Sequence, residues 1–368
     1  MAKFSDAVQT QMNRDNPRGP LSPLLSAASQ GYRGALAVRE KLFSTGVIKQ
    51  KKARVPVLSI GNLTLGGTGK TPMAIHVAHL LSHAGLKVGI ASRGYGGSMQ
   101  KIGGIVSDGQ NLLSTASQAG DEPLLMAIKL PGVPVAVAAE RALAAGLLAD
   151  RFGVDLVILD DGFQHRRLYR DCDLLLADAK KPLGSGRLFP AGTLREPATA
   201  AERAHALVLT RSDGSEPVPA FWTEYGHGPV FRCRHEPLGF TESAVFGLSA
   251  HASPPALLPL SHIQNRPVAA FSAIAGNAGF FEALAPFAGR LVFSKGFRDH
   301  HAFTEKEIKE LALAALKAGA TAIVTTEKDC VRLNGWSPDE IPVLALSVGL
   351  LFHPGPDLGQ FLRERLGF

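Results

Sequence analysis

The chain has 368 residues, of which 45% are hydrophobic and 19% charged, so it can bury a large core and is expected to form two domains. Its net charge of +7 favours an anionic partner. Its three widely spaced cysteines fit neither a disulfide framework nor a zinc site and indicate a reducing compartment. The sequence shows no run long enough for a membrane-spanning helix and no signal-peptide pattern at its start.

Residues 1–54 are predicted to form a basic, amphipathic N-terminal segment. Between residues 20 and 54, seven lysines and arginines stand against one acid, Glu40, with leucines and aromatic residues interleaved. Such a segment can lie in the interface of an anionic membrane. The alternative is an ordinary first helix that packs on the domain and exposes its lysines to water.

Residues 55–81 have the pattern of a strand, a glycine-rich loop and a helix. The strand is predicted over residues 55–61, the loop over 63–69 and the helix over 70–81, a context in which backbone N–H groups hold a phosphate. The predicted ATP-binding residues are Thr64, Leu65, Gly66, Gly67, Thr68, Gly69, Lys70 and Thr71. In this loop Lys70 would reach the β- and γ-phosphates, and the Thr71 hydroxyl would hold Mg²⁺. The alternative is a glycine-rich turn with a surface lysine.

Apolar strands and helices alternate after this unit, which predicts a P-loop three-layer α/β/α domain over residues 55–221. Strands are predicted at 87–92, 133–138, 154–161, 172–179 and 205–210, and helices at 121–130 and 140–152. Residues 222–266 are rich in Gly, Pro and Ser, with one alternating run, "PVFRCRHEP", and are interpreted as a hinge. A second, smaller α/β domain is predicted over residues 267–368, with a capping box formed by Thr304 and Glu307. The active site is expected in the cleft between the two lobes.

Two adjacent carboxylates, Asp160 and Asp161, end a predicted buried strand. In a P-loop protein the acid that closes such a strand completes the Mg²⁺ shell together with the loop threonine. Because neighbouring strand residues point to opposite faces, one acid is expected to bind metal and the other to act elsewhere.

Several further motifs leave more than one interpretation open. Asp121 in "AGDEP" fits a helix N-cap better than a catalytic group. Arg93 in "SRGYGG" fits either an anion contact or the surface, and His300 in "FRDHHAF" fits a metal site, a base or a capped turn. The guanine-reading N-K-x-D is absent, since Lys328 stands directly before Asp329, and a GTP switch is therefore disfavoured.

Taken together, "NLTLGGTGKTP", "SRGYGG", "GDEP", "DDGFQHRRLYRDCDLLL", "GRLFPAGTLREP", "FSAIAG", "FRDHHAF" and "TTEKD" resemble the tetraacyldisaccharide 4'-kinase family of lipid A synthesis. The resemblance covers about residues 55–333. It implies ATP- and Mg²⁺-dependent phosphorylation of the 4'-hydroxyl of a tetraacyldisaccharide 1-phosphate to form lipid IVA. It also implies a peripheral enzyme on the cytoplasmic face of the bacterial inner membrane.

The resemblance also assigns residues, and it reverses the N-cap interpretation of Asp121. Asp121 becomes the catalytic aspartate and His300 its partner from the second lobe, so that the two meet when the hinge closes. Lys70 and Asp161 complete the implied catalytic group, and Thr71 and Asp160 the metal site. The residues that fall on family positions near substrate or phosphate are Arg93, Tyr95, Arg141, Gln164, Arg195 and Glu196. The sequence departs from the family pattern at "AIAGNAGFF", and residues 1–20 have no counterpart in it.

The expected partners are the lipid disaccharide substrate and the anionic inner-membrane surface, with no nucleic acid and no obligate protein partner. A lipid substrate would explain why a basic amphipathic segment precedes the first strand. Two rival interpretations share the nucleotide residues. One is a P-loop kinase or ligase acting on a water-soluble substrate, and the other is a membrane-associated partitioning or scaffold ATPase, which would need no His300.

Overall fold

The computed structural model describes residue 12 and residues 21–247 and 256–368. Apart from residue 12, the unmatched extension over residues 1–20 therefore lies outside the described residues. The chain groups into two compact units, the first made of Met1–Met73, Ile158–Arg234 and Leu351–Phe368, and the second of Ala74–Val157 and His235–Leu350. The domain limits expected from the sequence, 1–54, 55–221, 222–266 and 267–368, remain a prediction.

The first unit is an α/β structure built on parallel strands. Its elements are α2 (Ser22–Ser44), β1 (Val57–Asn62), β6 (Cys172–Asp178), η2 (Ala198–Arg203), β7 (Ala206–Thr210), α7 (Ala220–Tyr225) and α11 (Leu358–Leu366). Strand β6 pairs in parallel with β1 on one side and with β7 on the other. Four elements run across the limits of the two units: α3 (Lys70–His83), β5 (Leu156–Asp160), β8 (Val230–Glu242) and β12 (Val343–Phe352).

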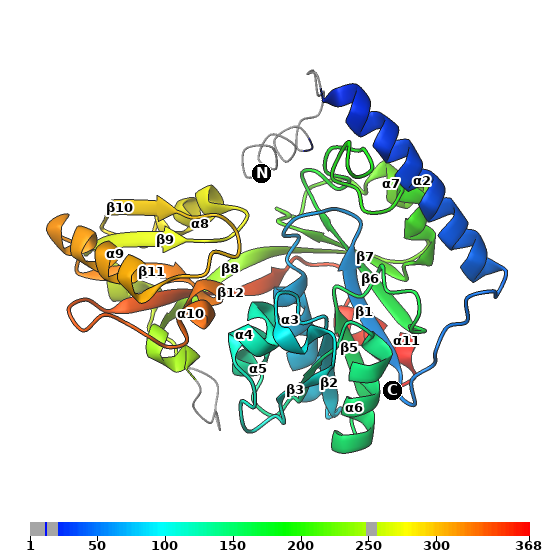
Figure 1. Cartoon of the computed structure of the whole chain (residues 1–368), viewed down its shortest axis with the longest axis horizontal. Coiled ribbons are helices and arrows are strands. Elements are labelled where there is room, and N and C mark those ends of the chain that lie inside the picture. Colours follow the sequence, from blue (N-terminus) through cyan, green and yellow to red (C-terminus); the bar gives the residue numbers. More distant parts are fainter. Residues whose placement is uncertain (1–11, 13–20, 248–255) are drawn as a thin grey trace. The chain divides into compact units, whose positions relative to one another are not determined.

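Helices cover both faces of the sheet in the first unit. On one face Leu207 belongs to a buried cluster with Phe221 and Trp222 of α7, and Tyr32 of α2 packs against that cluster. Figure 1 shows α2 beside α7. The neighbouring residue of β7 points to the other face, where its partner Phe231 has its ring centroid 5.6 Å from that of Phe361 in α11. The predicted three-layer α/β/α arrangement is confirmed in this unit.

The second unit also has an α/β structure. Its elements are β2 (Val88–Ser92), η1 (Ser98–Gln100), β3 (Gly104–Ser107), α4 (Ala116–Ala119), α5 (Asp121–Lys129), β4 (Val135–Val137), α6 (Arg141–Phe152), η3 (Ser243–Phe246), η4 (Leu260–Ile263), β9 (Pro267–Ser272), α8 (Asn277–Leu284), β10 (Arg290–Gly296), α9 (Glu305–Lys317), β11 (Ala322–Thr326) and α10 (Glu327–Leu333). Strands β2 and β4 are parallel, and β3 adds an antiparallel edge to β4. Strands β10, β9, β11 and β12 form a second parallel group in that order.

The β10–β9–β11–β12 group is the smaller α/β portion that the sequence predicts. Val268, Val324 and Leu344 of its strands share a buried cluster with Phe280 and Leu284 of α8. The predicted capping box opens α9: the N–H of Glu307 donates to the Thr304 hydroxyl, while the Glu307 carboxylate accepts from the Thr304 N–H. These contacts satisfy two backbone donors that the first helical turn leaves open.

The structure adds elements that the sequence pattern did not predict. The segment interpreted as a hinge, 222–266, contains the whole of the thirteen-residue strand β8. Strand β3 and helices α7, α10 and α11 were also not expected. All three cysteines are free and buried. Among the described residues, no helix combines the length and the apolar character that crossing a membrane requires.

Candidate active site

The phosphate loop follows β1 and leads into α3, as predicted from the sequence. Gly66 and Gly69 have φ values of 113° and 80°, a left-handed region that side-chain-bearing residues avoid. The amide of Asn62, the last residue of β1, donates to the Thr68 hydroxyl at 2.9 Å and accepts from Lys70 Nζ at 3.4 Å. One buried asparagine therefore fixes both the loop and its lysine.

The two acids that end β5 have different surroundings. Asp160 is buried, with 2% of its surface exposed. Asp161 has a positive φ of 51°, and both of its carboxylate oxygens accept from Arg195 Nη1 at 2.9 Å. Lys70 Nζ lies 3.8 Å from Asp161 Oδ1. Two cations thus compensate the charge of Asp161.

The neighbouring residues Arg195 and Glu196 make contacts with different groups. Arg195 also donates to Gln164 Oε1 at 3.4 Å, and its backbone N–H donates to the Leu63 carbonyl at 2.7 Å. Glu196 is 2% exposed and accepts from Arg39 of α2 and from Arg203, the latter at 2.5 Å. A substrate or phosphate contact by Glu196 remains a prediction, and here its carboxylate ties α2 to the loop.

A divalent cation fits the donor set at the phosphate loop. Magnesium prefers hard oxygen ligands, and the Thr71 hydroxyl and the Asp160 carboxylate supply them. Asp161 is less suited to this task because Arg195 engages both of its oxygens. Asp160, at the end of a buried strand, is the acid that better matches a metal ligand in this unit.

The second group of predicted residues is built around the start of α5. Gly120, with φ 90°, lies so close to the "SRGYGG" loop that a Cβ at this position would be 2.7 Å from the Tyr95 carbonyl oxygen. A Cβ on Gly97 would likewise be 2.3 Å from the Gln118 carbonyl. Because both positions require glycine, these two motifs pack tightly together and place Asp121 at the first turn of the helix.

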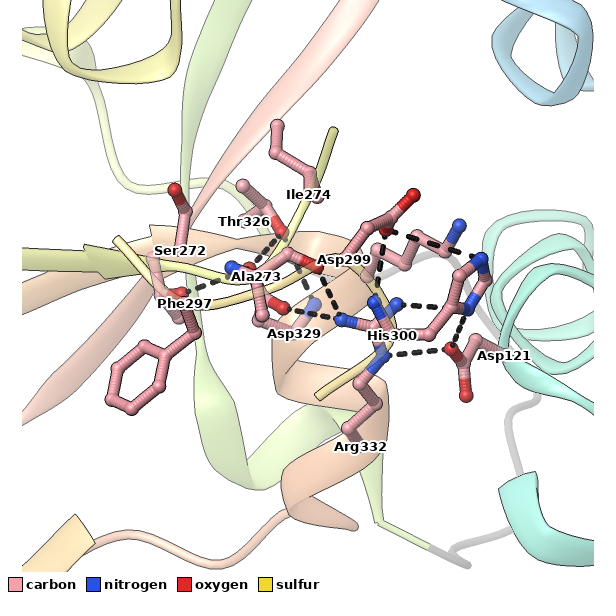
Figure 2. A network of polar contacts seen from close by, with 12 residues as sticks. Asp121, Ser272, Ala273, Ile274, Phe297, Asp299, His300, Thr326, Asp329 and Arg332 are labelled. Carbon is pink, nitrogen blue, oxygen red and sulfur yellow. Dashed lines mark hydrogen bonds and ion pairs between the residues drawn. The ribbon is translucent and has the colours of Figure 1, made fainter. Parts of the chain in front are cut away.

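Asp121 and His300 are within hydrogen-bond distance, 179 residues apart in the sequence. His300 Nδ1 lies 3.3 Å from Asp121 Oδ2, and Arg332 Nε donates to the same oxygen at 2.7 Å (Figure 2). Both residues lie in the second compact unit. His300 has a positive φ of 58°, in a turn where its N–H donates to Asp299 Oδ1 at 3.0 Å. The Tyr95 ring lies 5.8 Å from the imidazole, centroid to centroid.

Opposing effects set the pKa of Asp121. Burial raises it, but the hydrogen bond from His300 and the charge and hydrogen bond of Arg332 outweigh burial, with a further contribution from Lys328. The net result is a pKa below the ordinary value of an aspartate. Asp121 is therefore ionised at neutral pH and able to accept a proton.

The other predicted contact residues of the second unit are spread out. Arg93 is exposed, and Tyr95 exposes 64% of its surface. Arg141 is 4% exposed, and its Nη1 donates to the carbonyls of Ala138 and Ala139 at 3.0 and 3.1 Å. Their roles toward substrate remain predictions. Within the described part of the chain, no three metal-binding side chains gather, so the structure offers no support there for a metal site around His300.

Two residues of the site were not foreseen from the sequence. Asn62 carries a weak signal, because it directly follows the buried strand that leads to the phosphate loop. Arg332 carries no such signal, because its position in the sequence predicts only a contact with Asp329 one helical turn earlier. Its contact with Asp121 becomes visible only in the structure.

Known proteins match the whole chain. The sequence model of the tetraacyldisaccharide-1-P 4'-kinase family matches residues 21–367. The chain is 42% identical over 372 residues to the tetraacyldisaccharide 4'-kinase of Desulfatibacillum aliphaticivorans, with 100% of this chain and 99% of that protein covered. It is 42% identical to the same-named protein of Geobacter metallireducens over 84% of this chain and 88% of that protein.

A solved structure agrees with these sequence matches. LpxK from Aquifex aeolicus, crystallised in complex with ATP, matches with a TM-score of 0.75 and 32% identity, over 94% of this chain and 98% of that chain. The phosphate loop, the acid pair and the Asp121–His300 contact are thus found in a chain that belongs to the tetraacyldisaccharide 4'-kinase family.

Proposed function

We propose that this protein transfers the γ-phosphate of ATP to the 4'-hydroxyl of tetraacyldisaccharide 1-phosphate, forming lipid IVA in lipid A biosynthesis. The observation that carries the proposal is the contact between His300 and Asp121, 3.3 Å long, in a chain that also has a phosphate loop. An alcohol acceptor needs a base, because its proton must leave during the transfer.

Asp121 is the proposed base, and His300 its orienting partner. The 4'-oxygen forms a bond to the γ-phosphorus while the bond from that phosphorus to the β,γ-bridging oxygen breaks, and ADP leaves. The proton of the hydroxyl passes to the Asp121 carboxylate. The lowered pKa of Asp121 keeps this carboxylate in the ionised form that the step requires.

The phosphate groups of ATP are proposed to bind to the phosphate loop and to the positively charged side chains beside it. Lys70 and Arg195, both beside Asp161, would compensate the charge that develops during transfer. Thr71 and Asp160 would hold Mg²⁺, which neutralises phosphate charge when bound. Gln164, whose amide donates to the Asn62 carbonyl at 2.8 Å, would keep Arg195 in place.

The lipid part of the substrate and the membrane are proposed to lie along α2. This helix exposes Leu24 and Val38 by 65% and 60%, and its Arg33 and Lys41 are also exposed. A cavity of about 400 Å³ opens along the same helix. It is lined partly by Leu183, Leu188, Ala191 and Leu194. An apolar lining next to basic residues suits an acyl chain and an anionic surface, which supports peripheral association with the cytoplasmic face of the inner membrane.

Transfer of labelled phosphate tests this proposal directly. The purified protein is incubated with γ-labelled ATP and the disaccharide lipid in detergent micelles, and the position of the new phosphate is mapped. We expect label on the 4'-position, strongly reduced in Asp121→Asn and retained in the exposed control Asp339→Asn. ATP consumption without labelled lipid would instead favour a partitioning or scaffold ATPase. Label on a water-soluble acceptor would favour a different kinase.

A further inference from the structure

Arg332 of α10 is a nearly buried side chain that the reaction described above does not use. Its side chain is 5% exposed, and its guanidinium group divides its donors between two acids (Figure 2). Nε donates to Asp121 Oδ2 at 2.7 Å, while Nη1 donates to Asp329 Oδ1 and to the Ala273 carbonyl, both at 2.8 Å. The planar guanidinium can hold three acceptors in a fixed geometry, which a lysine cannot.

The anchor of Arg332 is itself rigidly held. Asp329 is fully buried and accepts from the Thr326 hydroxyl at 2.7 Å and from the Ala273 N–H at 3.1 Å. Burial raises the pKa of Asp329, while its hydrogen bonds and the charge of Arg332 act in the other direction. The guanidinium therefore sits between α10 and the end of β9, with little freedom to move away from Asp121.

The contacts of Asp121 are concentrated on one of its two oxygens. Oδ2 faces both Arg332 Nε and His300 Nδ1. Over residues 21–247 and 256–368, Oδ1 has no hydrogen bond to the protein. Because both partners hold Oδ2, Oδ1 is the oxygen that remains for the proton of the acceptor hydroxyl.

Nδ1 of His300 lies near both Asp121 and Arg332, and whether Nδ1 carries a proton decides which of the two it can hydrogen-bond. Nδ1 lies 3.3 Å from Asp121 Oδ2 and also 3.3 Å from Arg332 Nη2. An arginine only donates, so Nδ1 can accept from Arg332 only without its proton, and can donate to Asp121 only with it. The charge of Asp121 and the position of the proton on His300 are thus linked through Arg332.

Other charged groups surround Asp121 without replacing this contact. Lys328, on the same helix as Arg332, donates to Glu122 Oε1 at 3.0 Å. Asp299 Oδ1 lies 3.9 Å from His300 Nε2, and the Tyr95 phenol adds a polar group near the imidazole. Among the residues that the structure describes, Arg332 is the one arginine or lysine that hydrogen-bonds Asp121.

We propose that Arg332 is a positioning residue for phosphoryl transfer, which keeps Asp121 ionised, leaves Oδ1 free for the acceptor hydroxyl and sets the proton position of His300. This inference rests on the proposed function, because it assumes that Asp121 accepts the proton. Arg332 itself touches neither nucleotide nor acceptor in this account. Its effect on the rate should therefore depend on Asp121 and on pH.

The test compares pH profiles of kcat for the wild type, Arg332→Met, Arg332→Lys and Lys328→Met. Without the guanidinium charge of Arg332, Asp121 is protonated more easily. The acid limb of the kcat profile of Arg332→Met should therefore shift to higher pH by about one unit. Its loss of kcat should then be about tenfold larger on the acid side than on the plateau. Arg332→Lys should keep the acid limb, because the charge remains, but lose kcat. Lys328→Met removes one charge from the same helix and should shift the limb much less.

A double variant separates positioning from general structural damage. In an Asp121→Asn background, Arg332→Met should lower the residual kcat by less than about twofold, because its target is gone. Thermal unfolding and ATP affinity are measured for every variant. If Arg332→Met does not fold, Arg332→Lys decides the question, because an unchanged kcat in that variant would overturn the inference. An unshifted acid limb in Arg332→Met, or losses that multiply in the double variant, would overturn the inference. If the wild type itself does not phosphorylate the lipid, the proposed function fails instead.

Discussion

Asp121 and Arg332 form an ion pair in which the arginine Nε lies 2.7 Å from Asp121 Oδ2, the same oxygen that faces His300 at 3.3 Å. Helix α10 packs against α5, which brings a residue of the C-terminal part of the chain to the first turn of a helix more than 200 residues earlier. Because both partners hold one oxygen, the carboxylate is oriented as well as charged. Its chemistry therefore depends on residues outside its own motif.

The first prediction concerns the pH dependence of stability. Burial raises the pKa of Asp121, but His300 and Arg332 together lower it by more than burial raises it. The pKa of Asp121 in the folded protein is therefore below its unfolded value. The stabilisation from the ionised form is then complete above the unfolded pKa of about 3.9 and is lost as pH falls through the lower folded pKa. We expect the difference in free energy of unfolding between wild type and Asp121→Asn to be constant near neutral pH and to shrink below about pH 4. Denaturant titrations at several pH values measure it, and a difference that grows toward acid would contradict the prediction.

The second prediction concerns the loop lysine. Lys70→Ala should lower kcat by roughly 10²–10³, because one donor to the developing charge is lost. Steady-state kinetics with the lipid acceptor measures the change, and Lys317→Ala on the exposed face of α9 is the matched control. Turnover of Lys70→Ala close to that of this control would show that the loop does not act on the transferred phosphate.

The third prediction concerns the buried carboxylate of Glu196. Its side chain is 3% exposed between Arg39 and Arg203, so Glu196→Gln removes the carboxylate that both guanidinium groups contact and leaves Arg203 with Glu40 at 3.9 Å. We expect the free energy of unfolding to fall by about 3 kcal/mol, as is typical when a buried ion pair loses one partner. Glu305→Gln, which removes an exposed i,i+4 partner of Lys309, should change stability little. Equal stability of the two variants would mean that the contact between α2 and the loop is not stabilising.

The fourth prediction concerns the surface of α2 and the residues after it. Replacing Arg33, Lys41 and Lys49 by Gln removes three exposed charges. Each basic residue near an anionic surface contributes about 1 kcal/mol, so binding to anionic vesicles at low salt should weaken roughly 100-fold. The control replaces Lys306, Lys309 and Lys317 of α9 in the same way. If both triple variants bind vesicles equally well, the basic segment is not the membrane contact.

The sequence predicts local elements better than long-range contacts, for a physical reason. The strand, loop and helix around Lys70 appear where predicted, with the helix at Lys70–His83, because glycine geometry and apolar spacing are local signals. The capping box of Thr304 and Glu307 is another local signal that the structure confirms.

The contacts of Asp121, in contrast to these local elements, join residues that are far apart in the sequence. From spacing alone Asp121 fits an N-cap, and its pairing with His300 came from the family resemblance. The resemblance placed the two residues in different lobes, whereas the structure has them in contact within one compact unit. Arg332 lies on a seven-residue helix that has no strong pattern, so its role depends on how α10 packs against α5. Strand β8 was missed because glycine and proline interrupt the sequence around it.

The central claim is that Asp121 and His300 act as one unit on the acceptor hydroxyl. A double-mutant cycle of kcat tests it most directly, with Asp121→Ala, His300→Ala and the double variant measured alongside ATP affinity. If the pair acts as a unit, each single variant should lose nearly as much kcat as the double variant, while ATP affinity changes little. If the loss in the double variant equals the product of the two single losses, the residues act independently, and the paired base must be abandoned.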